Sequence, residues 1–149
     1  MRDTYTWAFY QVVKEVQAKT GFELPHRVES YVTILLAKHI DKADFLPKKT
    51  FIQSYMNLCY TSWKDAVALA DTCLFMTGVF PDYHTSKGFN VEYFSNIGKS
   101  SYSQVIDHNN DPIYNVLSKN FNFIRDFISI TVNKKDFTPI YSISTIYGK

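Results

Sequence analysis

The sequence lacks an excess of charge of either sign. Its 149 residues include 16 Lys and Arg against 14 Asp and Glu, which leaves a formal net charge of +2 at pH 7. Proteins that bind nucleic acid mainly through electrostatics carry a clear basic excess. Only Arg2, Arg27 and Arg125 are arginines, so few side chains offer bidentate contacts to phosphate or guanine. We therefore keep a nucleic-acid-binding module only as the weakest functional alternative.

Long apolar runs are also missing. No stretch approaches the roughly 18 to 20 apolar residues that a membrane-spanning helix requires. The first residues, MRDTYTWAFYQ, contain neither the uninterrupted apolar core nor the small-residue cleavage site of a secretory signal. We expect a cytoplasmic protein with no membrane span. Export without a cleaved signal would leave no trace in these residues.

Cysteine, glutamate and glycine are too scarce for most metal and cofactor sites. Cys59 and Cys73 fall in apolar helical segments, where free thiols pack as small hydrophobic groups. The four glutamates cannot supply a dinuclear carboxylate site, and His26 with Glu29 forms one pair that nothing else joins. The glycines form no phosphate-binding loop. We expect no metal and no cofactor, and we name no catalytic residue, although a Cys–His pair could still meet in space.

Aromatic residues, in contrast, are abundant, with 12 Phe and 11 Tyr. The chain is long enough to form one domain with a real core, yet this number of rings exceeds what such a core needs. We expect some rings to face solvent, a partner or a cavity. The rings off the main apolar stripes or in loops are Trp7, Tyr10, Phe22, Phe45 and Tyr83. We predict association through them, in the first place as a homodimer.

Apolar residues spaced three and four apart predict an all-α fold. Six helices are expected, over residues 3–20, 25–40, 51–60, 62–79, 91–107 and 112–132. They should form a single compact bundle-like domain over 1–133, with the helix at 62–79 in its centre because that segment is apolar nearly all round. Residues 134–149 contain Pro139 and show no helical period, so we expect an extended C-terminal tail that is docked or disordered.

Local signals mark several of these helices. Gly21 is placed to end the first one. Ser62, with Asp65 three residues later, resembles a capping box at the start of the central helix. Gly98 and Ser101 are small residues on one helix face, and they would let another helix come close.

Asp71 is the sharpest single feature, because it stands in the almost entirely apolar run ALADTCLFMTGVFP at 68–81. A buried carboxylate without a partner costs on the order of several kcal/mol. We expect a hydrogen-bonded tie that fixes helix register, with His39, Tyr102, Arg125 or the backbone of a helix cap as the partner. The alternative is a pocket near Asp71 and Tyr102 in which the carboxylate binds a ligand or acts as an acid or base.

A second candidate surface is the loop FPDYHTSKGFN at 80–90, which joins two predicted helices. Loops held by rigid helices often carry recognition residues, and this loop offers two rings and an imidazole. The side chains that we predict to bind a ligand or partner are therefore Asp71, Tyr102, His39, Tyr83, His84 and Phe89.

Two motifs, DTCLFMTGVFP at 71–81 and VEYFSNIGKSSY at 91–102, resemble a family of uncharacterised bacterial helical proteins. In that family an aspartate precedes an apolar run that ends in Gly-x-Phe-Pro, and Tyr-Phe-x-x-apolar-Gly-x-x-Ser/Ala-Tyr follows. The resemblance covers about residues 29–130 and implies a bacterial source but no known activity. The matching residues are Asp71, Gly78, Phe80, Pro81, Tyr93, Phe94, Gly98, Ser101 and Tyr102.

These observations favour a non-enzymatic interaction or regulatory protein, because the aromatic surplus exceeds the core while no reactive cluster is visible. The expected partner is another protein or a second copy of the chain. The first alternative is a small-molecule-binding protein or an enzyme with a pocket near Asp71 and Tyr102. The nucleic-acid-binding module comes last.

Overall fold

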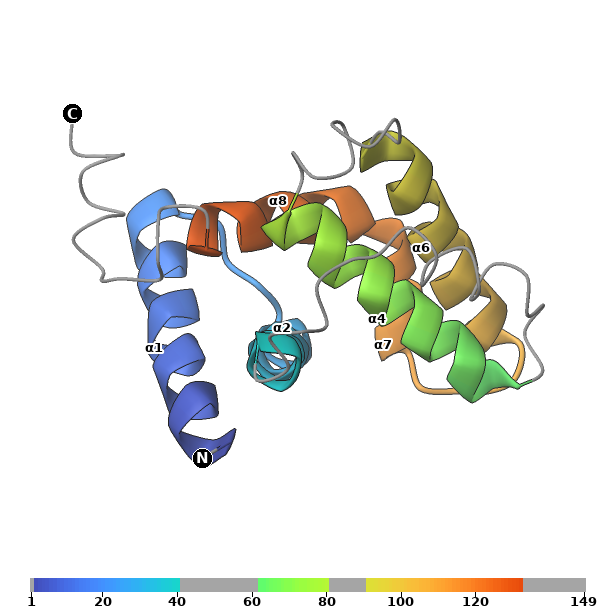
Figure 1. Ribbon diagram of the computed structural model, residues 1–149, viewed down its shortest axis with the longest axis horizontal. Coiled ribbons are helices and arrows are strands. Elements are labelled where there is room, and N and C mark those ends of the chain that lie inside the picture. The colour runs from blue at the N-terminus through green and yellow to red at the C-terminus, as the bar shows by residue number, and fades with distance from the viewer. Residues whose placement is uncertain (1, 41–61, 81–90, 133–149) are drawn as a thin grey trace. The chain divides into compact units, whose positions relative to one another are not determined.

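The computed structural model describes residues 2–40, 62–80 and 91–132 of the chain. Within these ranges all regular structure is helical and no strand occurs, which confirms the predicted all-α fold. Figure 1 shows the helices, which are α1 (Arg2–Thr20), α2 (His26–Ile40), α4 (Trp63–Val79), α6 (Val91–Ile106), α7 (Ile113–Lys119) and α8 (Phe121–Val132). The predicted helix at 51–60 and the predicted tail at 134–149 lie outside the described residues.

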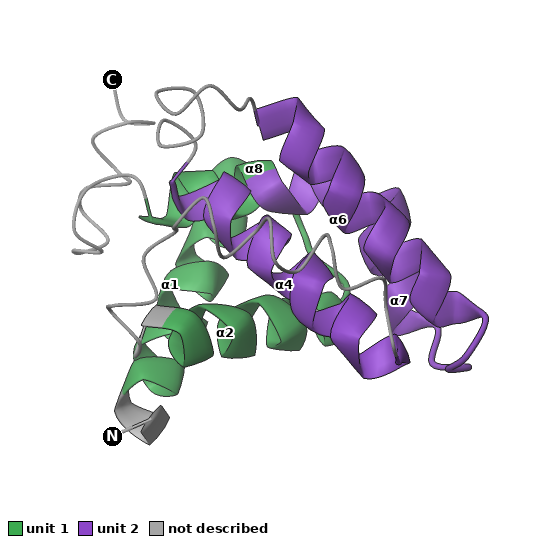
Figure 2. Ribbon diagram, turned by 45° about the vertical axis from the view of Figure 1, so that its right-hand side comes forward, with its two compact units in different colours: residues 1–44, 126–149 green, residues 45–125 purple. Residues whose placement is uncertain are grey.

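The chain divides into two compact units (Figure 2). The first unit contains α1, α2 and the end of α8, and the second contains α4, α6, α7 and the first residues of α8. Helix α8 contributes to both units because the boundary falls between Arg125 and Asp126. In the first unit, the end of α8 buries Phe127, Ile128 and Val132.

In the first unit, α1 forms because its apolar side chains recur on one face. Phe9, Val13 and Val16 are buried and lie four and three residues apart, as in an amphipathic helix. Gly21 follows with a φ of 81°, a conformation that favours glycine. Its N–H donates to the carbonyl of Gln17 at 2.9 Å. The predicted helix and its glycine stop are confirmed.

Helix α2 packs against α1 in the same unit. Its buried apolar residues are Val28, Val32, Leu35, Leu36 and Ala37. Figure 1 shows α1 from the side and α2 almost end-on, so the two helices cross rather than run side by side. The short connection between them is fixed by Gln17, whose Oε1 accepts a hydrogen bond from the N–H of Leu24 at 2.7 Å.

In the second unit, α4 is buried over most of its surface, as its apolar sequence predicts, and it packs against α6. Its N-cap is Ser62, whose hydroxyl oxygen accepts a hydrogen bond from the N–H of Asp65 at 3.3 Å. The Ser62 half of the predicted capping box is thus present. The residues that α4 buries are Ala66, Leu69, Ala70, Asp71, Thr72, Cys73, Leu74, Phe75, Met76, Thr77 and Gly78.

Helix α6 packs closely on its neighbours through Gly98. A Cβ atom added at Gly98 would overlap the ring of Phe121 and would lie 3.2 Å from the Cβ of Cys73. Phe121 and Cys73 are themselves completely buried. The expectation that a small residue here admits another helix is therefore confirmed.

The single helix predicted at 112–132 is wrong, because the chain forms α7 and α8 with a break at Asn120. The side-chain Nδ2 of Asn120 donates to the carbonyl of Val116 at 2.9 Å, and its own backbone N–H donates to the same carbonyl at 3.0 Å. Asn side chains compete in this way with the helical backbone. The buried residues Leu117 and Phe121 keep helical spacing across the break, so periodicity alone could not reveal it.

Candidate functional site

Among the described residues of the first unit, the two most exposed large apolar side chains, Trp7 and Ile34, lie beside a groove between α1 and α2. This aromatic groove has a volume of about 430 Å³, and its lining residues are Thr6, Trp7, Tyr10, Ser30, Thr33 and Ile34. Trp7 is 60% exposed, Ile34 57% and Tyr10 36%. The rings of Trp7 and Tyr10 stack with their centroids 5.9 Å apart and their planes 24° apart.

The exposed apolar area at the groove is large enough to matter. Taking about 200 Å² for one large side chain, Trp7, Tyr10 and Ile34 together expose on the order of 300 Å². Apolar patches of this size on a monomer often have a function. Sequence reasoning found Trp7 and Tyr10 but missed Ile34. The signal was available, because Ile34 falls outside the buried stripe of α2.

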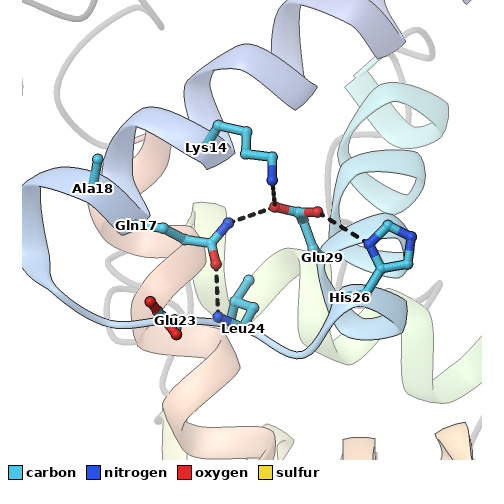
Figure 3. Close-up of a pocket in the computed structure, with 7 residues that line it drawn as sticks. All are labelled: Lys14, Gln17, Ala18, Glu23, Leu24, His26 and Glu29. Carbon is cyan, nitrogen blue, oxygen red and sulfur yellow. Dashed lines mark hydrogen bonds and ion pairs between the residues drawn. The ribbon is translucent and has the colours of Figure 1, made fainter.

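A second, polar pocket of about 410 Å³ also lies between α1 and α2 (Figure 3). The residues that line it are Lys14, Gln17, Ala18, Glu23, Leu24, His26 and Glu29. The side chain of Glu29 is only 4% exposed. Figure 3 shows the side chains of Lys14, Gln17 and His26 directed toward it.

Both carboxylate oxygens of Glu29 have partners. Oε2 accepts a hydrogen bond from Nε2 of Gln17 at 2.7 Å and lies 3.1 Å from Nζ of Lys14. Oε1 lies 3.7 Å from Nδ1 of His26, which forms an ion pair only when the imidazole is protonated. Sequence reasoning considered His26 and Glu29 only as possible metal ligands and did not reveal that Lys14 and Gln17 complete their network. Lys14 and Gln17 come from the other helix, and their spacing in the sequence gives no sign of the contact.

The electrostatics of this network keep Glu29 ionised. Burial alone raises the pKa of its carboxyl group, but the Gln17 hydrogen bond and the Lys14 hydrogen bond and charge outweigh burial, and the pKa falls below its ordinary value. The same hydrogen bond and negative charge raise the pKa of Lys14. A carboxylate held ionised by three neighbours is suited to joining two helices and poorly suited to accepting a proton in catalysis.

Lys14 connects the polar pocket to the aromatic groove. Its Nζ lies 5.6 Å from the centroid of the Tyr10 ring, within the range of a cation–π contact. Tyr10 in turn stacks on Trp7. Glu29 thus holds the ammonium group that covers one ring of the groove wall.

In the second unit, the hydroxyl of Tyr102 on α6 donates a hydrogen bond to Oδ1 of Asp71 on α4 at 2.6 Å. Asp71 is 9% exposed and Tyr102 is completely buried. The Tyr102 ring lies 6.0 Å from the ring of Phe121 and 6.4 Å from that of Tyr114, measured between centroids. Of the partners predicted for Asp71, Tyr102 is thus present, and the bond ties α4 to α6.

His39 and Arg125, which were also predicted as partners of Asp71, make contacts within their own units. Nδ1 of His39 lies 3.1 Å from the carbonyl oxygen of Leu35 on the same helix. The Arg125 guanidinium donates to the hydroxyl of Ser95 at 2.8 Å and lies 3.5 Å from the carboxylate of Glu92. The predicted recognition residues of the 80–90 loop, Tyr83, His84 and Phe89, lie outside the described residues, as do Phe45 and Cys59.

No reactive cysteine or metal site is apparent where the structure describes the chain. Burial raises the pKa of the Cys73 thiol to about 12, so the thiol is neutral at physiological pH and packs as a small apolar group. The described His, Cys, Asp and Glu side chains include no group of three that could hold a metal ion. None of the described helices combines the length and apolar character needed to cross a membrane.

Comparisons with protein-family models, with curated proteins and with solved structures each give no match to this chain. The resemblance of residues 71–81 and 91–102 to uncharacterised bacterial proteins therefore stays a prediction. The function has to be inferred from the chemistry of the groove, the polar pocket and the buried tie.

Proposed function

We propose that this chain is a non-enzymatic interaction protein that binds a segment of a partner protein in the aromatic groove. The observation that carries the proposal is the exposure of more than half of Trp7 and of Ile34 on the two helices that form the groove. Full burial of such a side chain stabilises by roughly 1.5–3 kcal/mol. A partner that covers both side chains gains a substantial part of that free energy.

The state of the ionisable groups supports binding rather than catalysis. Glu29 is held ionised by its neighbours, Lys14 is paired with it, and Cys73 is a buried neutral thiol. Each of these groups already has a structural role. The small-molecule alternative at Asp71 and Tyr102 has weaker support, because the Tyr102 hydroxyl is buried and already donates to Asp71.

Site-specific photo-crosslinking in the native host tests the proposal. A photoreactive phenylalanine analogue at position 34 should capture a discrete partner. The same analogue at position 22 is the matched control, because Phe22 is exposed to a similar degree and does not line the groove. An adduct with the mass of two chains would favour the predicted homodimer as the partner.

Binding of the captured partner in purified form completes the test. Trp7→Ala should weaken the affinity at least about tenfold, because it removes the largest exposed side chain of the groove. Phe22→Ala should leave the affinity unchanged. Equal capture at positions 34 and 22, or a Trp7→Ala variant with undiminished affinity, would contradict the proposed function.

A further inference from the structure

One oxygen of the buried Glu29 carboxylate can accept a further hydrogen bond. Oε2 already has Nε2 of Gln17 at 2.7 Å and Nζ of Lys14 at 3.1 Å. None of the residues that the structure describes donates a hydrogen bond to Oε1, because its contact with Nδ1 of His26 is 3.7 Å long and exceeds hydrogen-bond distance. Figure 3 shows the carboxylate among the side chains that line the polar pocket, with Oε1 on the side of His26. Buried polar atoms are normally hydrogen-bonded, so a donor that enters the pocket gains an acceptor in Oε1.

The polar pocket attracts positive charge. Among the described residues that line it, Lys14 contributes one ammonium group, whereas Glu23 and Glu29 contribute two carboxylates. Glu29 is ionised, because its neighbours lower the pKa of its carboxyl group below the ordinary value. With the imidazole of His26 counted as neutral, the lining has an excess of negative charge at pH 7. It therefore repels an anion and attracts a cation.

The donors and rings of the pocket distinguish between kinds of cation. A guanidinium group seeks both oxygens of a carboxylate, but Oε2 of Glu29 already has two donors. A quaternary ammonium group has no N–H and is recognised by aromatic rings, whereas the described lining contains no Phe, Tyr or Trp. The described residues also bring together no three side chains that could hold a metal ion. A primary ammonium group is a compact charge that can donate to the single oxygen Oε1.

The size and the remaining lining of the pocket fit an alkyl chain behind that ammonium group. The volume of about 410 Å³ lies in the range of small-molecule sites. Ala18 and Leu24 provide apolar surface in the lining. The side chains of Lys14 and His26 are 52% and 86% exposed, so a ligand can reach the pocket from solvent.

We infer that the polar pocket binds a primary alkylammonium group, which donates an N–H to Oε1 of Glu29 while its alkyl chain lies against Ala18 and Leu24. Glu23 adds a second attraction for the positive charge. Such a group occurs on free alkylamines and on the lysine side chains of other proteins. The inference concerns a pocket separate from the aromatic groove and does not depend on the proposed function.

Butylammonium and its N-trimethylated form test this inference, because they have equal charge and the same alkyl chain. Their binding to the isotope-labelled full chain at pH 7 and low salt is followed by nuclear magnetic resonance, through the side-chain amide of Gln17 and the backbone amide of Leu24. Butylammonium should shift both signals and should bind at least about tenfold more tightly, because the trimethylated form cannot donate to Oε1. Equal binding of the two compounds, or no shift with butylammonium, would overturn the inference.

Glu29→Gln should weaken the binding of butylammonium at least about tenfold, because it removes the charge of the acceptor. Glu15→Gln is the matched control, since Glu15 lies on α1 next to Lys14 in sequence and does not line the pocket. Its affinity should equal that of the parent. Undiminished binding in Glu29→Gln, or an equal loss in both variants, would contradict the site.

Lys14→Met keeps the test decisive if Glu29→Gln does not fold, because half of the Lys14 side chain is exposed. The substitution keeps the length of the side chain and removes the ammonium group that competes for Glu29. The affinity for butylammonium should rise at least about threefold, because the ligand no longer meets a like charge beside the carboxylate. A network that only joins two helices predicts no such gain, so an unchanged or lower affinity would count against the inference.

A lysine blocked at both backbone ends identifies the source of the ammonium group. Tighter binding of the blocked lysine than of butylammonium would assign the pocket to a lysine side chain of another protein. Weaker or equal binding would assign it to a free alkylamine, and both results support the ammonium site. Binding of neither compound would overturn it, while partner capture at position 34 would still stand as a separate test of the aromatic groove.

Discussion

Among the residues that the structure describes, each compact unit buries one acidic side chain, and the two are stabilised in different ways. Glu29 in the first unit is reached by donors that include Lys14, and half of the Lys14 side chain is exposed to solvent. Asp71 in the second unit accepts a hydrogen bond from Tyr102, which is completely buried. Water and salt can therefore reach the partners of Glu29, and they cannot reach the Tyr102 hydroxyl.

This difference indicates that the burial of the hydrogen-bond partner determines how much each acidic side chain contributes to stability. A donor at the surface regains hydrogen bonds to water when its carboxylate is removed, so the free energy lost is small. A buried hydroxyl has no such replacement and bears the full cost of losing its acceptor. We therefore expect substitutions at Asp71 to destabilise the protein more than substitutions at Glu29.

Asp71→Ala should have the largest effect on stability. It removes the acceptor of the Tyr102 hydroxyl and should lower the free energy of unfolding by roughly 2 to 4 kcal/mol. Asp71→Asn keeps the shape and an acceptor oxygen, so its loss should be about 1 kcal/mol. Chemical denaturation of both variants measures the two values.

The Asp71→Ala/Tyr102→Phe double variant is the matched control. Removing the hydroxyl together with its acceptor leaves no unsatisfied donor, so the double variant should be more stable than the sum of the single losses predicts. Denaturation curves of both Asp71 variants that overlay the parent would contradict the buried tie. They would also revive the ligand-binding alternative at this residue.

Gly98→Ala tests the close packing of the second unit, which contrasts with the exposed groove of the first unit. Alanine favours a helix by about 1 kcal/mol over glycine, but its methyl group would overlap the buried Phe121 ring. We expect a net loss of about 1 to 2 kcal/mol, because overpacking outweighs propensity. Ser100→Ala, at an exposed position of the same helix, should change stability little. A stabilised Gly98→Ala variant would mean that Phe121 has room to move.

Glu29→Gln should cost less than Asp71→Ala, on the order of 1 kcal/mol at neutral pH. The amide keeps the size of the side chain and loses the charge that pairs with Lys14. Glu23→Gln is the control, because Glu23 lines the same pocket without belonging to the network. Thermal unfolding of both variants at low salt measures the difference. If Glu29→Gln lowers the free energy of unfolding as much as Asp71→Ala does, the burial of the hydrogen-bond partner does not determine which substitution costs more.

The pH dependence of stability provides a second measurement on Glu29. Its pKa in the folded protein lies below the ordinary value of 4.5. Its contribution is therefore fully present above about pH 4.5 and disappears as the pH falls through the lowered folded-state pKa. Below about pH 4.5, the free energy of unfolding should fall less steeply with decreasing pH in Glu29→Gln than in the parent, and at neutral pH the two slopes should agree. Equal slopes in acid would show that Glu29 is not the group that causes the loss of stability.

The sequence predicted those features that depend on local spacing. The burial of Phe9, Val13 and Val16, the stop at Gly21 and the cap at Ser62 each follow from residues within one or two helical turns. These signals are local, so the sequence alone contains them. The all-α fold class follows from the same periodicity.

Features that depend on side-chain contacts between helices were harder to predict. Asp71 stood out because a charge in an apolar run needs a partner, and Tyr102 was one of several candidates. Glu29 gave no such signal, because it looked like part of an isolated pair with His26 while its main donors come from α1. The break at Asn120 was also hidden, since the apolar spacing continues across it. Hydrophobic periodicity indicates which face of a helix is buried, but it does not indicate which side chains of other helices contact that face.

Trp7→Ala should have the smallest effect on stability and the largest effect on binding. Trp7 leaves 60% of its surface in water, so removing it sacrifices little buried area. We expect the free energy of unfolding to stay within about 0.5 kcal/mol of the parent, as for most surface substitutions. Val13→Ala on the same helix is the contrast, because Val13 is completely buried and its truncation leaves a cavity. Urea denaturation of both variants decides the point: a Trp7→Ala loss as large as that of Val13→Ala would make the tryptophan a core residue and would remove the basis for the interaction surface.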